Sequence, residues 1–196
     1  VHEINLDTAK NYKVETKNKS FMTSESQNYS YWGTRIDTSA GQTHILRVMR
    51  MKAMMEYPSK EKYTQLLMEH IKAKCIVFAN TQAQADKLCS YSYHSGNKNS
   101  EENLLMFKEG KINKLSTVLQ LNEGVNIPNL KQGIIMHAYG NERKSAQRLG
   151  RLLRLSPDQK ATVHILCYVG TVDETWVIQA LEQYDNSKIK WIETNG

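Results

Sequence analysis

The sequence predicts an α/β protein in which helices flank a parallel sheet, and two features carry that prediction. From Cys75 onward, segments typical of strands alternate with segments typical of helices, an order that produces parallel pairing. The first strand segment, CIVFAN at 75–80, is a continuous apolar run. Such a run is expected of a strand that is covered on both faces.

The first part of the chain is polar and poorly periodic. We expect residues 1–42 to form an N-terminal extension or linker and residues 43–196 to form the main domain. Within the extension, residues 1–15 could supply a short strand, and residues 21–41 are interpreted as a loop or small hairpin. The aromatic residues there, which either stack on bases or pack within the protein, are Tyr29, Tyr31 and Trp32.

Two helices are predicted before the first buried strand. Ile45, Val48 and Met49 fall near one face of the segment 44–56, the spacing of an amphipathic helix. A second helix is expected to start near Pro58 and Ser59. The residues expected on its inner side are Leu66, Leu67 and Ile71.

The later elements follow from capping residues and apolar runs. Thr81 is a suitable N-cap for a helix, and Gly110 is a natural C-terminal stop for another, which begins at Asn99 or Ser100. A last helix is expected from Thr171 to about residue 185. The remaining predicted elements are strands within 90–96 and at 116–121, 133–139 and 161–169, and a helix that contains QRLGRLLR at 147–154.

Composition narrows the classes of function without choosing one. The net charge is +6 at pH 7, which favours an anionic partner. The three cysteines are far apart and contain no CxxC pair, as expected for reduced, buried thiols in a cytoplasmic protein rather than a disulfide or zinc framework. No apolar run is long enough to predict a membrane span. Because the chain starts at Val1 with no leader pattern, it is expected to be part of a longer polypeptide.

The polar loops after the predicted strands indicate where a ligand could bind. In a parallel α/β sheet, ligands bind beyond the carboxyl ends of the strands. The loops after Asn80, His94, Leu121 and Tyr139 read ANTQ, YHSGN, NEGVN and GNERKS, and all are polar. This edge of the sheet is therefore the predicted functional edge.

The segment QRLGRLLR concentrates guanidinium groups. On a helix, Arg143, Gln147, Gly150 and Arg154 share one face, with Arg151 at its rim. This pattern fits two alternatives, a solvated basic face that pairs with acidic residues or a surface that grips phosphate through bidentate guanidinium groups. The opposite, buried stripe of the same helix is Ala146, Leu149 and Leu153.

QRLGRLLR resembles motif VI of superfamily 2 helicases and translocases, Q/H-R-x-G-R-x-x-R. IVFANT at 76–81 resembles motif IV, YHSG at 93–96 resembles motif IVa, and the segment 107–130 resembles the region that ends in motif V. The order and spacing agree with that family over roughly residues 60–180. The resemblance implies the second, RecA-like domain of such a motor.

The resemblance also implies roles for residues of motif VI. Arg151 and Arg154 correspond to arginine fingers, which reach the γ-phosphate of ATP held by a first domain. Gln147 would lie beside the same phosphate. Arg148 is placed with the nucleotide-binding residues at the cleft, where it serves helix packing or an interdomain ion pair.

Further contacts are implied for the other motifs. Gly124 and Asn126 lie where motif V meets the ribose of ATP, and the family commonly has Asp in place of Asn126. Thr117, Gln120 and Asn122 are alternatives for the motif V threonine. The residues implied to contact the nucleic-acid backbone are Asn80, Thr81, His94, Ser95, Gly96, Thr117 and Gln120.

The sequence contains no GxxxxGK[ST] loop. We therefore expect ATP and Mg²⁺ to be bound mainly by an N-terminal RecA-like domain of the same protein, and this chain alone to have no ATPase activity. DNA is favoured over RNA, because NEG before VNIP and the Gln-led motif VI resemble the repair and restriction-type branch. The alternative is a noncatalytic helicase-like module that binds nucleic acid or a protein.

Other polar residues have simpler interpretations. His137 and His164 lie inside apolar strand segments and are predicted to be core histidines rather than ligands. Asp173 and Glu174 follow a glycine at a predicted helix start, where acidic side chains complement the helix dipole. No metal ligand set is predicted.

Overall fold

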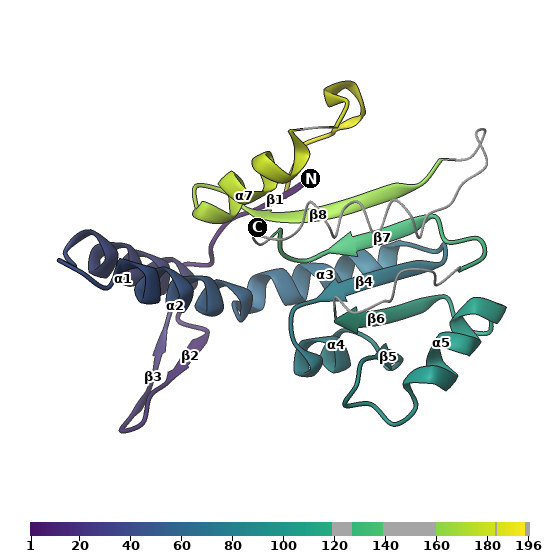
Figure 1. Cartoon of the computed structure of the whole chain (residues 1–196), viewed down its shortest axis with the longest axis horizontal. Helices are drawn as coiled ribbons and strands as arrows, with labels where there is room; N and C mark the ends of the chain where they lie inside the picture. The colour runs from purple at the N-terminus through teal and green to yellow at the C-terminus, as the bar shows by residue number, and fades with distance from the viewer. Residues whose placement is uncertain (119–126, 139–159, 183, 195–196) are drawn as a thin grey trace. The chain divides into compact units, whose positions relative to one another are not determined.

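The computed structural model describes residues 1–118, 127–138, 160–182 and 184–194, and the chain divides into two compact units (Figure 1). The first unit comprises Val1–Ile4 and Glu61–Gly196, and the second comprises Asn5–Lys60. The boundary expected after residue 42 falls inside the second unit, directly before its second helix.

The first unit contains a seven-stranded sheet in which every described pairing is parallel, so the predicted fold class is confirmed. The strand order is β5-β6-β4-β7-β8-β1-β9. The strands are β1 (His2–Ile4), β4 (Cys75–Ala79), β5 (Ser92–Tyr93), β6 (Lys114–Val118), β7 (Gln132–Ile135), β8 (Thr162–Tyr168) and β9 (Ile192–Glu193).

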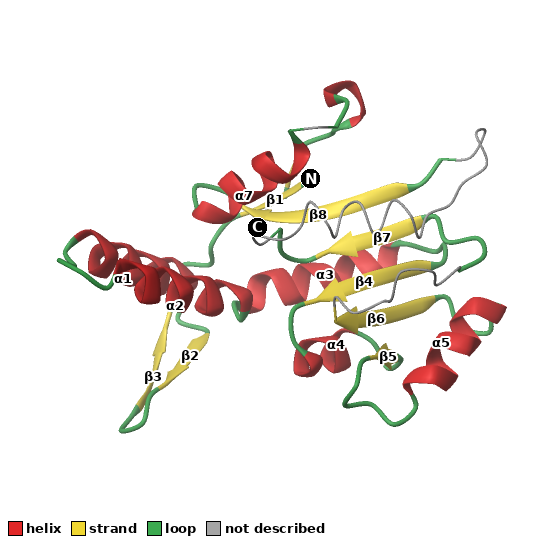
Figure 2. Cartoon of the chain, in the orientation of Figure 1, coloured by secondary structure: helices red, strands yellow, loops and turns green. Residues whose placement is uncertain are grey.

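Helices flank this sheet, and their ends agree with the predicted caps (Figure 2). Thr81 accepts a hydrogen bond from the backbone N–H of Gln84, and Gly110 ends a helix with a φ of 77°. None of the helices in the described part of the chain is long and apolar enough to cross a membrane. The helices are α3 (Pro58–His70), α4 (Gln82–Leu88), α5 (Ser100–Glu109), α7 (Val172–Leu181) and the 3₁₀ helix η1 (Asn186–Lys188).

The central strand β4 is buried at all five positions, as its apolar run predicts. Ile76 and Phe78 belong to the main hydrophobic cluster, together with Leu115 of β6 and Phe107 of α5. Because side chains alternate along a strand, Val77 points to the opposite face, where it is also fully buried. Apolar cover on both faces leaves only the ends of β4 for polar chemistry.

Some predicted boundaries and faces were wrong. Lys114 already pairs with Cys75, so β6 begins two residues before the predicted Ser116. β7 ends at Ile135, short of the predicted residue 139. Leu66 was expected on the inner side of α3, but it is 46% exposed. The buried side of α3 instead includes Thr64 and Met68, so the helix is rotated relative to the prediction.

The second unit contains a hairpin and two helices. β2 (Tyr12–Glu15) pairs antiparallel with β3 (Ser20–Thr23), as the hairpin interpretation allowed. The helix α2 (Thr43–Met55) lies where a helix was predicted, but the predicted apolar face was wrong, since Ile45 and Met49 are exposed and Met54 is buried. The helix α1 (Glu25–Asp37) falls within a segment predicted to be loop or hairpin, so that prediction was wrong.

A capping signature marks the start of α1. The side chain of Ser24 accepts a hydrogen bond from the backbone N–H of Gln27, and the two form the S-x-x-Q pattern of a capping box. The buried face of α1 includes Glu25 and Asn28 as well as Ile36. Because two of these three side chains are polar, α1 lacks a clear apolar period. The Ser24–Gln27 spacing is the sequence signal that could have revealed this helix.

The aromatic residues of α1 contact other side chains of the second unit. The Arg50 guanidinium lies 5.2 Å from the centroid of the Tyr29 ring. Arg35 donates a hydrogen bond of 3.0 Å to the hydroxyl of Tyr31, whose ring meets that of Trp32 edge-on at 5.2 Å. These contacts favour the packing interpretation of the aromatic residues over base stacking.

Two histidines belong to a chain of hydrogen bonds in the first unit. His2 Nδ1 lies 2.8 Å from the hydroxyl of Tyr63, and His2 Nε2 lies 2.8 Å from His164 Nδ1. His164 Nε2 lies 2.8 Å from Gln132 Oε1. The chain links α3, β1, β8 and β7, so His164 has a structural role, as predicted.

The free energy of unfolding is expected to decrease in mild acid because of His2. Burial, followed by the neighbouring His164, lowers the pKa of His2 from 6.5 to about 4. Between these pH values the unfolded chain binds a proton that folded His2 does not bind. The contribution of His2 to the free energy of unfolding should therefore be fully present above pH 6.5. Between pH 6.5 and 4 it should fall by on the order of 1 kcal/mol per pH unit.

Urea unfolding of the wild type and of His2→Gln at several pH values would measure this effect. The variant should show a shallower decrease in stability between pH 6.5 and 4. Identical pH profiles for the two proteins would show that His2 does not titrate as its burial requires.

Candidate functional site

The structure brings two of the predicted loops together at the carboxyl edge of the sheet. Asn80 and Thr81 follow β4, and Ser95 and Gly96 follow β5. Although β6 lies between these strands, the side-chain amide of Gln82 donates a hydrogen bond of 3.1 Å to the hydroxyl of Ser95. Residues that are far apart in sequence thus form one surface.

The first loop is fixed by the start of α4. The Thr81 hydroxyl accepts a hydrogen bond of 3.1 Å from the backbone N–H of Gln84, while Gln84 Oε1 accepts one of 3.1 Å from the backbone N–H of Asn80. Thr81 itself is exposed. The amide nitrogen of the Asn80 side chain has no hydrogen-bond partner among the described residues. This loop therefore exposes the Thr81 residue, whereas the amide nitrogen of Asn80 is buried.

The second loop rests on a polar network beneath it. Asp86 Oδ1 accepts hydrogen bonds from Ser92 Oγ at 2.5 Å and from His94 Nε2 at 2.8 Å. Asn97 Nδ2 donates to Ser92 Oγ at 2.8 Å. The hydrogen bond from Ser92, followed by that from His94, lowers the pKa of the Asp86 carboxyl. The network holds an ionised carboxylate under the loop at neutral pH.

His94 contributes to this edge through its backbone, whereas its imidazole points inward. The His94 side chain is only 4% exposed. Its N–H donates to the hydroxyl of Ser100 at 3.0 Å, and its carbonyl accepts from the same hydroxyl at 2.6 Å. Ser95 and Gly96, by contrast, are exposed, and their backbone N–H groups have no partner in the described part of the chain. Two free amide donors at one turn are suited to an anionic oxygen.

Gly96 has a steric reason to be glycine. A Cβ atom at this position would lie 2.4 Å from Gln82 Oε1, the end of the side chain that also holds Ser95. Any larger residue must displace that amide. A side chain at this position would therefore compete with the contact between Gln82 and Ser95.

Thr117, a predicted nucleic-acid contact, lies elsewhere. It is fully buried in β6, and its hydroxyl donates to the carbonyls of Tyr93 and Val118, both at 3.0 Å. Its side chain serves the sheet and is not available to a ligand at the surface, which corrects the expectation.

The other predicted site residues lie outside the described residues, in the segments 119–126 and 139–159. The predicted helix with QRLGRLLR lies there too. The predictions for these residues stand as made from the sequence. They concern Gln120, Gly124, Asn126, Gln147, Arg148, Arg151 and Arg154.

The acidic pair at the start of α7 behaves as predicted. Asp173 Oδ2 accepts a hydrogen bond of 2.8 Å from the backbone N–H of Tyr168, and Glu174 Oε2 accepts one of 2.9 Å from that of Gly170. Both carboxylates satisfy backbone donors around the helix start. Within the described ranges, no group of three or more His, Cys, Asp or Glu is placed to hold a metal ion.

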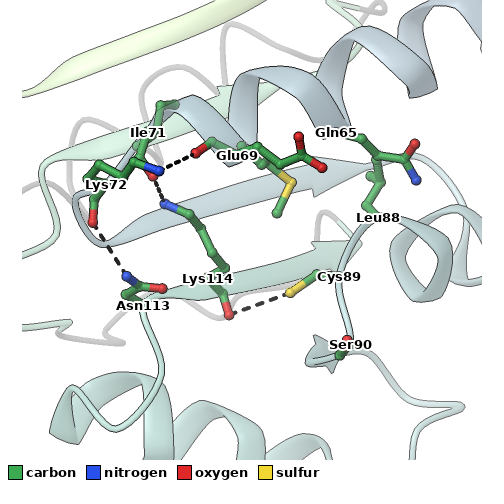
Figure 3. A pocket seen from close by; sticks show the side chains of 10 residues that line it. Gln65, Glu69, Ile71, Lys72, Leu88, Cys89, Ser90, Asn113 and Lys114 are labelled. Atoms are coloured by element: carbon green, nitrogen blue, oxygen red, sulfur yellow. Dashed lines mark hydrogen bonds between the residues drawn. The ribbon is translucent and has the colours of Figure 1, made fainter.

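A pocket of about 630 Å³ lies where β6 begins, between the end of α3 and the end of α4 (Figure 3). The ammonium group of Lys114 donates to the carbonyls of Ile71 and Ala73, and that of Lys72 donates to the carbonyl of Glu69. Both cations satisfy carbonyls at the C-terminal end of α3. Lys114 follows α3 by more than forty residues, so no local pattern in the sequence predicts this pocket. Its lysines are explained by their hydrogen bonds to carbonyls at the end of α3.

Sequence reasoning missed two supports of the site, Gln82 and Asp86. They are four residues apart and so lie on one face of α4, the face that meets the second loop. That spacing of two polar residues on a helix with apolar Ala85 and Leu88 inside is the signal that could have revealed them.

A sheet whose described pairings are all parallel, with polar loops grouped at its carboxyl edge, defines an α/β domain of the class to which RecA-like domains belong. The chain belongs to the helicase conserved C-terminal domain family, whose sequence profile matches residues 59–156. It is therefore a C-terminal RecA-like domain of the superfamily 2 helicase type, as the motif resemblance indicated.

Comparisons with individual proteins agree. The chain is 30% identical over 119 residues to the DNA 3′-5′ translocase XPB2 of Sulfurisphaera tokodaii, a match that covers 58% of this chain and 27% of the relative. The chain thus corresponds to about a quarter of that protein's length.

Two solved structures share the fold. The Sulfolobus solfataricus SWI2/SNF2 ATPase core domain superposes with a TM-score of 0.60 at 13% identity, covering 84% of this chain and 41% of that one. The Saccharomyces cerevisiae Dbp5 bound to RNA and ADP BeF3 superposes with a TM-score of 0.57 at 15% identity, covering 70% and 38%.

Removing the Asp86 carboxylate should destabilise the fold. In Asp86→Ala, Ser92 and His94 lose their shared carboxylate acceptor and keep only their mutual contact of 3.2 Å, and the loss of hydrogen bonds to a charged group costs about 1–3 kcal/mol. Urea unfolding at neutral pH measures the change. Lys87→Ala, at the adjacent exposed position, is the control and should stay within about 0.5 kcal/mol of the wild type. Equal stabilities for the two variants would show that the network contributes little.

Proposed function

We propose that this chain is the C-terminal motor lobe of an ATP-dependent DNA helicase or translocase. The observation that carries the proposal is the family match at 59–156, which spans the two joined loops as well as QRLGRLLR. The similarity to a DNA translocase favours DNA over RNA. The relative is far longer than this chain, and the activity of the whole protein is part of the proposal.

Arg151 and Arg154 are proposed to act as arginine fingers. A planar guanidinium can make two hydrogen bonds to the equatorial oxygens of the γ-phosphate, where negative charge is spread in the transition state. Gln147 would lie beside the same phosphate, and Gly124 and Asn126 beside the ribose. Bound Mg²⁺ would neutralise charge on the β- and γ-phosphates.

A first RecA-like lobe is proposed to hold most of the nucleotide. This chain has no phosphate-binding GxxxxGK[ST] loop, so its own residues would act on ATP only across a cleft between two lobes. Opening and closing of such a cleft during hydrolysis would move the lobes along a strand.

The joined loops at the carboxyl edge are proposed to grip the nucleic-acid backbone. Ser95 and Gly96 are exposed residues of one turn whose N–H groups bond to none of the described residues, and exposed Thr81 lies on the loop joined to it. Such donors fit phosphate oxygens and carry no base specificity. The rigid network beneath the second loop supports this role, because preorganised donors lose less entropy on binding.

Replacement of the proposed fingers should stop turnover in the longer protein. Arg151→Ala and Arg154→Ala should each reduce nucleic-acid-stimulated ATP hydrolysis about 10³-fold or more and leave ATP affinity nearly unchanged. Arg143→Ala, on the same predicted helix face but outside the motif, is the matched control. Wild-type turnover in both finger variants would remove the assignment.

The 196-residue chain alone should show no ATP hydrolysis, and nucleic-acid-stimulated hydrolysis by it would contradict the two-lobe arrangement.

A carboxylate at the second loop should weaken nucleic-acid binding. Ser95→Asp places a negative charge beside the free amides, and repulsion by phosphate should reduce affinity for an oligonucleotide at least about tenfold. Ser90→Asp makes the same change at an exposed serine outside the two loops and should have little effect. Fluorescence anisotropy with labelled DNA measures both. Equal affinities for the two variants would exclude this loop as the contact.

A further inference from the structure

The β2–β3 hairpin of the second unit has a surface that the proposed function does not use. Between residues 10 and 23 the chain has four lysines and a single acidic residue, Glu15. This segment lies outside the helicase family match, which begins at residue 59. Its charge and shape therefore need their own explanation.

The hairpin is a defined structure with a basic tip. Its turn is closed by hydrogen bonds between Thr16 and Lys19, of which the backbone bond from Thr16 N–H to the Lys19 carbonyl measures 2.9 Å. Lys17 and Asn18 lie at the end of this turn and are exposed. Within the second unit, the strands project away from α1 and α2 (Figure 1).

One face of the hairpin is apolar and only partly covered. Val14 pairs directly with Phe21, and Tyr12 pairs with Thr23, so these four side chains share a face. At its base, Tyr12 packs edge-on against Tyr57, with ring centroids 5.0 Å apart. Toward the tip the cover ends, and Phe21 is 45% exposed. An aromatic ring is thus held in solvent by a strand pair that is anchored at the other end.

The hairpin lysines differ in their partners and in their distance from the Phe21 ring. Lys19 Nζ lies 5.7 Å from the centroid of the Phe21 ring. Lys13 is paired with Glu15 at 2.6 Å, on the other face. Lys17 and Lys19 make no ion pair with any residue that the structure describes. One such cation, Lys19, therefore lies beside the exposed ring, and the other, Lys17, is exposed in the adjoining turn.

We propose that the β2–β3 hairpin binds single-stranded nucleic acid, with Phe21 stacked on a base and Lys17 and Lys19 on the flanking phosphates. Single strands are bound by such pairs of features, because every unpaired base has a face that can stack and every linkage has a negative charge. A duplex offers phosphates but no free base face. This inference rests on the proposed function, which makes the protein a nucleic-acid motor.

Binding by the 196-residue chain to fluorescein-labelled oligo-dT tests the stacking contact. Phe21→Ala should weaken binding about fivefold or more, and Phe21→Trp, which keeps an aromatic face, should restore it. Met22→Ala removes an equally exposed apolar side chain from the opposite face of the hairpin and should bind like the wild type. Circular dichroism would show that each variant is folded.

The salt dependence of binding tests the lysines. The double variant Lys17→Ala/Lys19→Ala should reduce the slope of log K against log salt by about 1.4, since each phosphate contact on a single strand contributes about 0.7. Lys62→Ala/Lys188→Ala removes two exposed lysines of the first unit and should leave the slope unchanged.

The outcomes separate this inference from the function on which it rests. Wild-type binding that the hairpin variants leave intact would overturn the hairpin proposal alone. No binding by the wild type, at low salt and with either strand or duplex, would overturn both. If Phe21→Ala reduced the affinity for duplex DNA more than the affinity for oligo-dT, base stacking by Phe21 would be excluded. Binding to phosphatidylserine vesicles without binding to oligo-dT would assign the hairpin to a membrane surface and overturn the proposal.

Discussion

The parallel pairing of β4 with strands on both sides is the constraint from which the candidate site follows. Val77 pairs with Ser116 of β6 and with Ile134 of β7, and every residue of β4 is buried. A strand covered in this way can expose polar groups only beyond its ends. Because parallel strands end at the same edge, the loops after β4 and β5 emerge together, close enough for the hydrogen bond from Gln82 to Ser95.

Polar side chains support that edge through hydrogen bonds to one another and to the backbone. Asn103 Nδ2 donates to the carbonyl of Ser92 at 2.9 Å, while Asp86 accepts from the hydroxyl of Ser92 and from the ring of His94. With these side chains in the network, the exposed residues of the loop are Ser95 and Gly96. Under the proposed function, backbone N–H groups there meet the phosphates that all nucleotides share.

The sequence predicted the parts of the fold that carry local signals. An apolar run marks β4, Thr81 marks the start of α4, and Gly110 marks the end of α5. By contrast, β1 and β9 have three and two residues, too few for a period, and they exist only through pairing with distant strands. In the candidate site, too, some features follow from local sequence and others from tertiary contacts. Motif positions identified the loops, but the inward direction of the Thr117 and His94 side chains depends on register and tertiary contacts.

Lysine and arginine are concentrated in different parts of the chain, and their side chains suit different contacts with phosphate. Residues 5–58, which precede the family match, contain eight basic and five acidic residues and so carry a net charge of +3. The hairpin in that segment uses lysine only, a flexible point charge that suits phosphates whose positions change as a strand moves. Four of the seven arginines, with their rigid planar groups, fall at 143–154. A guanidinium fork is useful where one phosphate must be met in one geometry, as at a hydrolysed nucleotide. The distribution of Lys and Arg is therefore what the two proposals require, with arginine for a nucleotide phosphate and lysine for the backbone of a strand.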